Sequence, residues 1–241
     1  SPEARRTRPR SLISWSHPPC AHLTAARTIL SAAPRKGASS LVNVDGVCAD
    51  CCDIGSVRSG FGWARVLRSG GNLVALGGST IDGCADRLRA DLAARRVVTL
   101  GIEAPAYLPV PTAAGELCKG RPGERDRSCF APAGTYVAAV GLHELAYILR
   151  RCGPHRATLR WDGWSPTDAS LVLLWEGFVS KGAHTKTDDH VADAATGAAE
   201  FLDRAARGGL VSDIGGGRGE VISLVGVAAL WAGWSDDLAA L

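Results

Sequence analysis

Residues Cys51 to Ala64, with the sequence CCDIGSVRSGFGWA, decide the fold that we expect. A short apolar run reaches Asp53, a turn rich in Gly and Ser follows, and an apolar segment from Phe61 to Leu67 runs back. This pattern predicts a β-hairpin whose first strand carries a carboxylate at the rim of a sheet.

The rest of the chain alternates between strand and helix patterns after this hairpin. Three antiparallel strands followed by helix, strand, helix, strand and helix predict an α/β fold, a mixed sheet flanked by helices. A long Pro-, Gly- and Arg-rich loop is expected over 107–133, and loops of that length in compact domains are usually functional. The expected strands are 41–47 (continued or replaced by 48–54), 61–67, 72–79, 97–102 and 171–179, the expected helices are 81–95 (capped by Thr80 or Asp82), 135–152 and 188–207, and 221–231 fits either.

Two further stretches carry acids in settings like that of Asp53. Glu103 ends an apolar strand that Pro105 stops, and a helix that begins near Asp189 presents His190 and Asp193 on one face. Carboxylates that converge without enough basic partners repel one another, and a hard divalent cation with oxygen ligands relieves that repulsion. The acids therefore predict a Mg²⁺ or Mn²⁺ site, in which a metal-bound water attacks a phosphodiester.

Each of these acids also has an ordinary structural interpretation. Asp53 could simply end a strand, and Asp189 could be an N-cap favoured by the helix dipole. Glu103 is harder to dismiss, because an unpaired buried acid is costly. Glu176, inside an apolar strand, could be a fourth site acid or a paired structural one.

Basic side chains in two loops are candidates for substrate phosphates. Arg121 and Arg125 lie in the long loop, and Lys181 and His184 lie just before the third helix. The alternative for both groups is a solvated polar loop.

At this point the motifs resemble a known superfamily. The segment from Asp53 to Gly62 resembles the first motif of RuvC-type Holliday-junction resolvases, and His190-x-x-Asp193-Ala194 resembles their last motif. Glu103-Ala104-Pro105 is similar to the acid-Ala-Pro of a bacterial family of predicted RNase H-like nucleases of unknown function. The resemblance covers about residues 47–234 and implies an RNase H-like fold. It also implies that Asp53, Glu103 and Asp193 are catalytic metal-binding acids, assisted by His190 or Asp189, and that nucleic acid is the substrate.

Two alternatives from other classes stay open. Residues 213–220, DIGGGRGE, resemble a phosphate loop of the sugar-kinase and actin-like ATP-binding superfamily, but too few residues follow for the second subdomain that such proteins need. A catalytically inactive RNase H-like scaffold could instead use exposed Trp residues to bind a partner. Metal binding separates these classes, because a scaffold would show none and an ATPase would need nucleotide as well.

Charge and composition set the remaining expectations. Residues 1–40 hold seven basic side chains against one acid, so the net charge of +3 leaves the rest of the chain at −3. We expect 1–40 to be a disordered or non-native extension and 41–241 to form the domain. Because the chain contains no Met, even at position 1, it is expected to be a fragment, and truncation at its C-terminal end is left open. The eight Cys are expected to be reduced thiols of a cytoplasmic protein without a membrane span; homodimerisation is left open.

Overall fold

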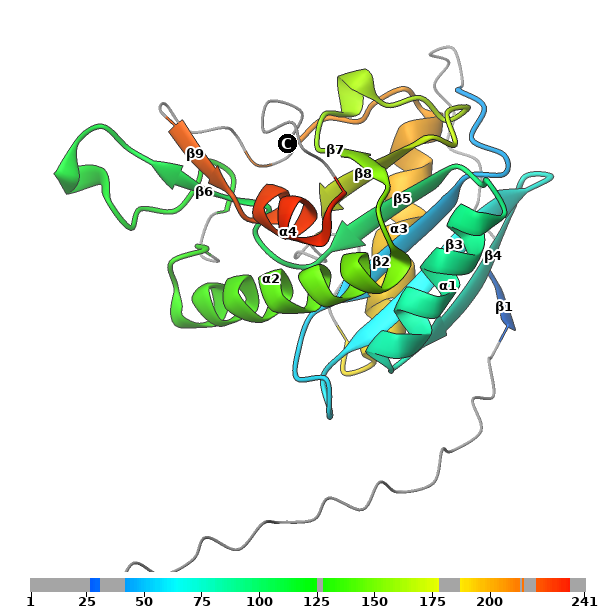
Figure 1. The fold of residues 1–241 in the computed structure, drawn as a ribbon, viewed down its shortest axis with the longest axis horizontal. Coiled ribbons are helices and arrows are strands. Elements are labelled where there is room, and N and C mark those ends of the chain that lie inside the picture. The colour runs from blue at the N-terminus through cyan, green and yellow to red at the C-terminus, as the bar shows by residue number, and fades with distance from the viewer. Residues whose placement is uncertain are drawn as a thin grey trace, which may run out of the picture.

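The structure, a computed structural model, describes residues 27–30, 42–124, 128–177, 187–212, 214 and 220–234 (Figure 1). None of the helices in these ranges is long and apolar enough to cross a membrane. The helices are α1 (Ile81–Ala93), α2 (Pro132–Cys152), α3 (His190–Ala206) and α4 (Leu224–Ala232), with short 3₁₀ turns at Ala114–Glu116 and Trp161–Gly163.

A mixed sheet forms the centre of the molecule, with the strand order β1-β4-β3-β2-β5-β8-β7. Strands β2, β3 and β4 are antiparallel neighbours, and β5 and β8 continue the sheet parallel to β2. This α/β arrangement confirms the expected fold class, and its strand order is compatible with an RNase H-like fold. The strands are β1 (Arg27–Leu30), β2 (Cys48–Asp53), β3 (Gly62–Ser69), β4 (Asn72–Gly78), β5 (Val98–Ile102), β7 (Arg156–Thr158) and β8 (Leu171–Glu176).

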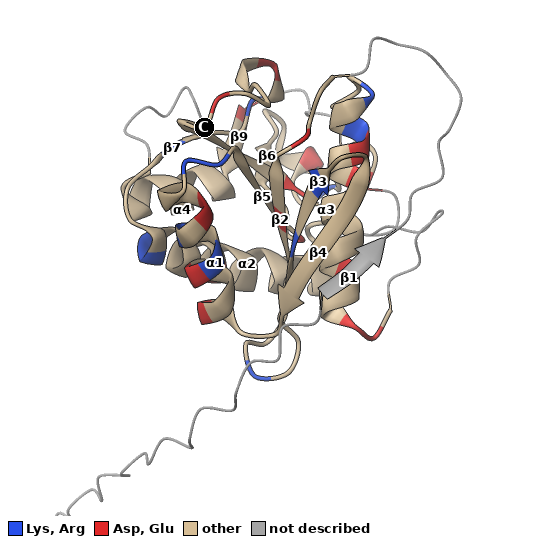
Figure 2. Ribbon diagram, turned by 90° about the vertical axis from the view of Figure 1, so that its right-hand side faces the viewer, with Lys and Arg blue, Asp and Glu red and all other residues tan. Residues whose placement is uncertain are grey.

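Helices cover both faces of the sheet (Figures 1 and 2). Helices α1, α2 and α4 pack on one face around Leu88, Ile148 and Leu100, and α3 packs on the other around Leu202 and Val66. Strand β2 is buried along its whole length because it has strands on both sides and helices on both faces.

The alternation of side chains along β2 decides which layer Asp53 faces. Ala49 and Cys51 belong to the apolar cluster under α3, whereas Cys48 and Cys52 belong to the cluster under α1 and α2. Since successive side chains of a strand point to opposite faces, Asp53 points to the α3 side.

Most predicted elements are present, with a few corrections. Thr80 caps α1, since its Oγ1 accepts from the Gly83 amide at 3.2 Å, and the strand expected over 41–47 is replaced by β2. Helix α2 begins at Pro132, three residues earlier than predicted, because proline is well suited to the first position of a helix. The C-terminal segment that fitted either pattern holds both, a strand β9 (Glu220–Ser223) followed by α4.

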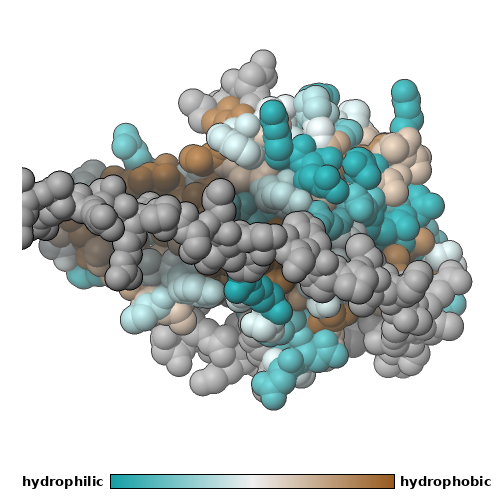
Figure 3. Space-filling model, turned by 60° about the horizontal axis from the view of Figure 1, so that its bottom comes forward, coloured by the Kyte–Doolittle hydropathy of each residue, from teal (hydrophilic) through white to brown (hydrophobic). Residues whose placement is uncertain are grey.

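The long loop contains more structure than its sequence predicts. Residues Tyr107–Val110 form β6, which pairs with β9 in a separate two-stranded antiparallel sheet. Exposed apolar side chains lie on β9 (Val221, Ile222), on α4 (Val227, Trp231) and at Tyr136 of α2. On the face seen in Figure 3, hydrophobic residues concentrate toward one end of the molecule.

Candidate functional site

Asp53 and Glu103 lie side by side at one rim of the sheet. The parallel register of β2 and β5 places Cys52 opposite Ile102. The next residue of each strand is an acid, Asp53 after Cys52 and Glu103 after Ile102. The Glu103 amide donates to the Cys52 carbonyl at 2.9 Å, which holds the two strand ends together. Both acids are buried, Asp53 being 1% and Glu103 9% exposed.

The start of α3 brings a third acid and a histidine to this rim. His190 Nδ1 lies 2.8 Å from Asp53 Oδ2, and Asp193, one turn further along α3, is 2% exposed. Each carboxylate oxygen of Asp193 accepts from the Thr187 amide at 3.0 Å, and the Thr187 hydroxyl donates to Oδ1. Thr187 thereby orients Asp193 toward the segment that precedes α3.

A small cavity joins the three acids that the sequence selected. Asp53, Glu103 and Asp193 all line it, and its volume of about 10 Å³ is roughly that of one water molecule. Its other walls are small side chains, which leave the space between the acids open: Cys51, Cys52, Gly177, Ala194 and Gly197. Segments up to 140 residues apart in the chain therefore meet at one point, as the sequence predicted.

The donor chemistry of this cavity suits a hard cation, but the side chains do not form a ready ligand set. Among the described residues, no group of three or more His, Cys, Asp or Glu is arranged so that it could hold a metal ion. Asp53 is turned to His190, and Asp193 is turned to Thr187. A cation held by all three carboxylates would require these side chains to turn toward one another.

Asp189 has a structural role at the start of α3. Its Oδ1 accepts from the Val191 amide at 3.0 Å and from the Ala192 amide at 3.1 Å, which makes it the N-cap of the helix. It does not line the cavity of the three acids. The structure therefore supports the capping interpretation of Asp189 that the sequence left open.

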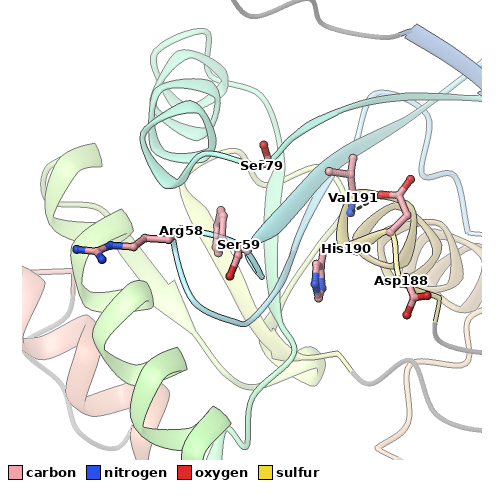
Figure 4. Close-up of a pocket in the computed structure, with 8 residues that line it drawn as sticks. Arg58, Ser59, Ser79, Asp188, His190 and Val191 are labelled. Atoms are coloured by element: carbon pink, nitrogen blue, oxygen red, sulfur yellow. Dashed lines mark hydrogen bonds between the residues drawn. The ribbon is translucent and has the colours of Figure 1, made fainter. Parts of the chain in front are cut away.

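A larger groove, of about 430 Å³, adjoins the acids (Figure 4). His190 lies between the two sites, since its imidazole bonds Asp53 and also lines the groove. Ser59 on the hairpin and Ser79 after β4 add hydroxyl groups to the wall, while Arg58 extends away from His190. A molecule in this groove would lie against His190 and next to the buried acids.

Arg121 is held inside the molecule by two carboxylates. It is 2% exposed, and its guanidinium donates to Glu176 at 2.6 and 2.8 Å and to Glu124 at 2.7 Å. Glu176 also accepts from the Ala106 amide, and burial raises the pKa of its carboxyl although Arg121 opposes the shift. In this arrangement Arg121 fastens the long loop to β8 and does not reach toward a substrate, and Glu176 is a paired structural acid.

Several other residues that the sequence selected lie in segments that the structure does not describe. Arg125, Lys181 and His184 lie outside the described residues, as do the four glycines of 213–220. Thr187, which hydrogen-bonds Asp193, is a described residue that the sequence analysis missed. Its position two residues before an Asp N-cap, with a hydroxyl able to bond locally, was the available signal.

Comparison with known proteins adds no relative. No protein family, curated protein or solved structure matches this chain.

Proposed function

We propose that this protein is a metal-dependent nuclease that hydrolyses phosphodiester bonds. The observation that supports the proposal is the cavity in which Asp53, Glu103 and Asp193 meet at the carboxyl ends of parallel strands. Three buried carboxylates in one water-sized space are unfavourable for stability alone, because each ionised group loses its hydration. Such an arrangement is typical of a site that holds a cation.

Asp53, Glu103 and Asp193 would hold Mg²⁺ or Mn²⁺ once Asp193 turns from Thr187. A carboxylate has two oxygens, so Asp53 can bind a cation and still accept from His190. The cation would supply an activated water and would stabilise the leaving oxygen. This cavity is water-sized, and its remaining walls are small residues, so it would admit few solvent molecules to the reacting atoms.

His190 provides the chain's own proton chemistry. A carboxylate oxygen can only accept a hydrogen bond, so the bond to Asp53 requires the proton on Nδ1. In the neutral ring this leaves Nε2 as an acceptor, and the ring also lines the groove. His190 can therefore take a proton from, or return one to, a substrate group bound there, while Asp53 fixes its orientation.

The resemblance to RNase H-like nucleases supports nucleic acid as the substrate. The mixed sheet has a strand order that is compatible with an RNase H-like fold, and Asp53 and Glu103 lie at the ends of neighbouring strands. Whether the substrate is DNA, RNA or a junction is left to experiment.

A second candidate is an inactive RNase H-like scaffold that binds a partner. The observation that favours it is the absence, among the described residues, of a ligand set ready for a metal ion. Exposed Trp231, at 64% exposure, would then be available for a contact. Metal binding distinguishes this candidate from the nuclease.

The deciding experiment is a calorimetric titration of the full chain with Mg²⁺ and with Mn²⁺. The variants are Asp53→Asn, Glu103→Gln and Asp193→Asn, and Asp45→Asn, an exposed acid, is the matched control. We expect one site in the parent and the control and loss of binding in each of the three site variants. Nuclease assays on junction, single-stranded and RNA substrates then follow, and each site variant is expected to lower kcat by about 100-fold or more.

A parent protein that binds neither ion would exclude the metal-dependent nuclease and favour the scaffold. Binding that survives all three substitutions would place the metal elsewhere in the chain.

A further inference from the structure

The first residues of α3 rest on two glycines of the sheet. Gly62 in β3 is the register partner of Asp53, and Gly77 in β4 is the partner of Ala64. His190 lies against Gly62, and Val191 lies against Gly77. The point where α3 meets the sheet is therefore directly beside the Asp53–His190 hydrogen bond.

No side chain larger than hydrogen fits at Gly62 while α3 stays in place. A Cβ there would lie 2.4 Å from the carbonyl carbon of His190, 2.5 Å from its oxygen and 2.6 Å from its Cβ. Real Cβ atoms essentially never approach other atoms closer than 3.0 Å. At Gly77 a Cβ would lie 2.6 Å from Val191 Cγ1 and 2.6 Å from the Trp63 carbonyl oxygen.

The usual reason for glycine, a positive φ, does not apply here. Neither Gly62 nor Gly77 belongs to the glycines with positive φ, which lie in turns and helix ends of the described chain. Glycine inside a strand weakens the strand, because it loses more backbone entropy on folding than other residues and has no side chain to pack. The close approach of α3 is the remaining physical reason for two glycines at these positions.

We propose that Gly62 and Gly77 are positioning residues that set His190 onto Asp53. The bare backbone lets the start of α3 approach the sheet until Nδ1 reaches the carboxylate at 2.8 Å. Figure 4 shows His190 and Ser59 among the residues that line the groove. The catalytic consequence rests on the proposed nuclease function, whereas the placement of the imidazole does not.

Gly78 offers a matched control in the same strand. Its Cβ would meet the indole of Trp63, 3.1 Å from Nε1, and no atom of α3 is among its three nearest contacts. Gly78→Ala therefore adds the same methyl group to β4 without pushing on His190. Gly115, where a Cβ would meet nothing within 4 Å, is a second control.

The test follows the His190 imidazole by nitrogen NMR in the full chain with ¹⁵N-labelled histidine, and His190→Gln identifies its signals. In the parent we expect the signature of a protonated, hydrogen-bonded Nδ1. Gly62→Ala should remove this signature while circular dichroism shows a folded protein, and Gly78→Ala and Gly115→Ala should keep it. If the nuclease function holds, Gly62→Ala should lower kcat by about 100-fold with little change in KM, the effect of a displacement of about 1 Å.

A folded Gly62→Ala protein that keeps the parent signature would overturn the proposal. Should this variant not fold, Gly77→Ala decides by the same signature, and failure of both to fold would assign the glycines to the fold and not to the site. A lost signature in a protein whose parent shows no nuclease activity would support the positioning role and reject the proposed function. The two ideas therefore fail separately.

Discussion

Asp50 is an acid that is buried in the core of the described chain. It is 1% exposed, and neither carboxylate oxygen has a hydrogen-bond partner. Arg65 lies directly opposite on β3, but its guanidinium donates to Asp91 on α1 and to the Cys48 sulfur instead. Burial, reinforced by the nearby charge of Asp91, raises the pKa of Asp50 to about 7.

Asp50→Asn is therefore expected to stabilise the protein in a pH-dependent way. An acid whose folded pKa lies above its ordinary 3.8 is protonated in the native state at low pH, and its penalty grows as pH rises from about 4 to about 7. At pH 8 the variant should gain on the order of 2 kcal/mol, less than the full shift implies because the buried amide still lacks partners. At pH 4 the carboxyl of the folded parent is neutral, and the variant should be no more stable than the parent.

Urea unfolding of parent and variant at the two pH values measures this difference. Asp45→Asn, at an exposed position, is the control and should change little at either pH. An equal gain at pH 4 and pH 8 would show that ionisation of Asp50 is not the cause.

The sequence was enough to select two of the acids at the site, but not the residues around them. Asp53 and Glu103 could be predicted because each ends an apolar run, where a carboxylate stands out. Asp50 could not, since it was included in the same apolar strand, and its burial depends on β3, β5 and α1 packing around it. Thr187 and Gly62 act through contacts that only the folded chain creates.

At the scale of elements, substitutions of Asp189 at the start of α3 can distinguish an N-cap from a metal ligand. Asp189→Ser keeps an oxygen that can accept from the Val191 amide but removes the carboxylate, whereas Asp189→Ala removes both. We expect the free energy of unfolding of the serine variant to lie within about 0.5 kcal/mol of the parent value, and that of the alanine variant to be about 1 kcal/mol lower. Both should bind Mg²⁺ as the parent does, if the parent binds it.

Chemical denaturation gives the stabilities, and calorimetry gives the binding. Thr196→Ala, at a half-buried position in the middle of α3, is the control for helix stability. A folded Asp189→Ser protein that no longer binds metal would return Asp189 to the ligand set.

The long loop depends on one buried ion-pair network. Arg121→Met should destabilise the fold by about 3–5 kcal/mol, because it leaves Glu124 and Glu176 buried without their shared cation. Lys119→Ala breaks an exposed pair with Glu116 and should cost less than about 1 kcal/mol. Equal effects of the two substitutions in urea unfolding would contradict a structural role for Arg121.

The elements that the sequence predicted worst are those held by distant partners. Helices α1, α2 and α3 have apolar positions at helical spacing, and their extents could be read within a few residues. The short strands β6 and β9 lack a clear period, and each is a strand because the other lies beside it. Their pairing joins residues more than a hundred positions apart, which no local pattern reveals.

At the scale of the whole molecule, β1 is a four-residue strand at the edge of the main sheet and pairs with β4 on one side. Removing residues 1–41 should therefore leave the cooperative fold intact. We expect the unfolding temperature to change by less than about 3 °C, the shift that roughly 1 kcal/mol produces in a domain of this size. Scanning calorimetry of the 42–241 chain and the full chain measures this difference.

The same truncation should change association, because it removes β1 from the edge of β4. Strand β1 pairs with residues Leu73 to Leu76, and an uncovered edge exposes backbone donors and acceptors to a second chain. Light scattering should show more self-association for 42–241 than for the full chain, and Val74→Lys on the uncovered edge should reduce it. A monomeric 42–241 protein would show that β4 needs no cover, whereas loss of cooperative unfolding would show that the first 41 residues belong to the domain.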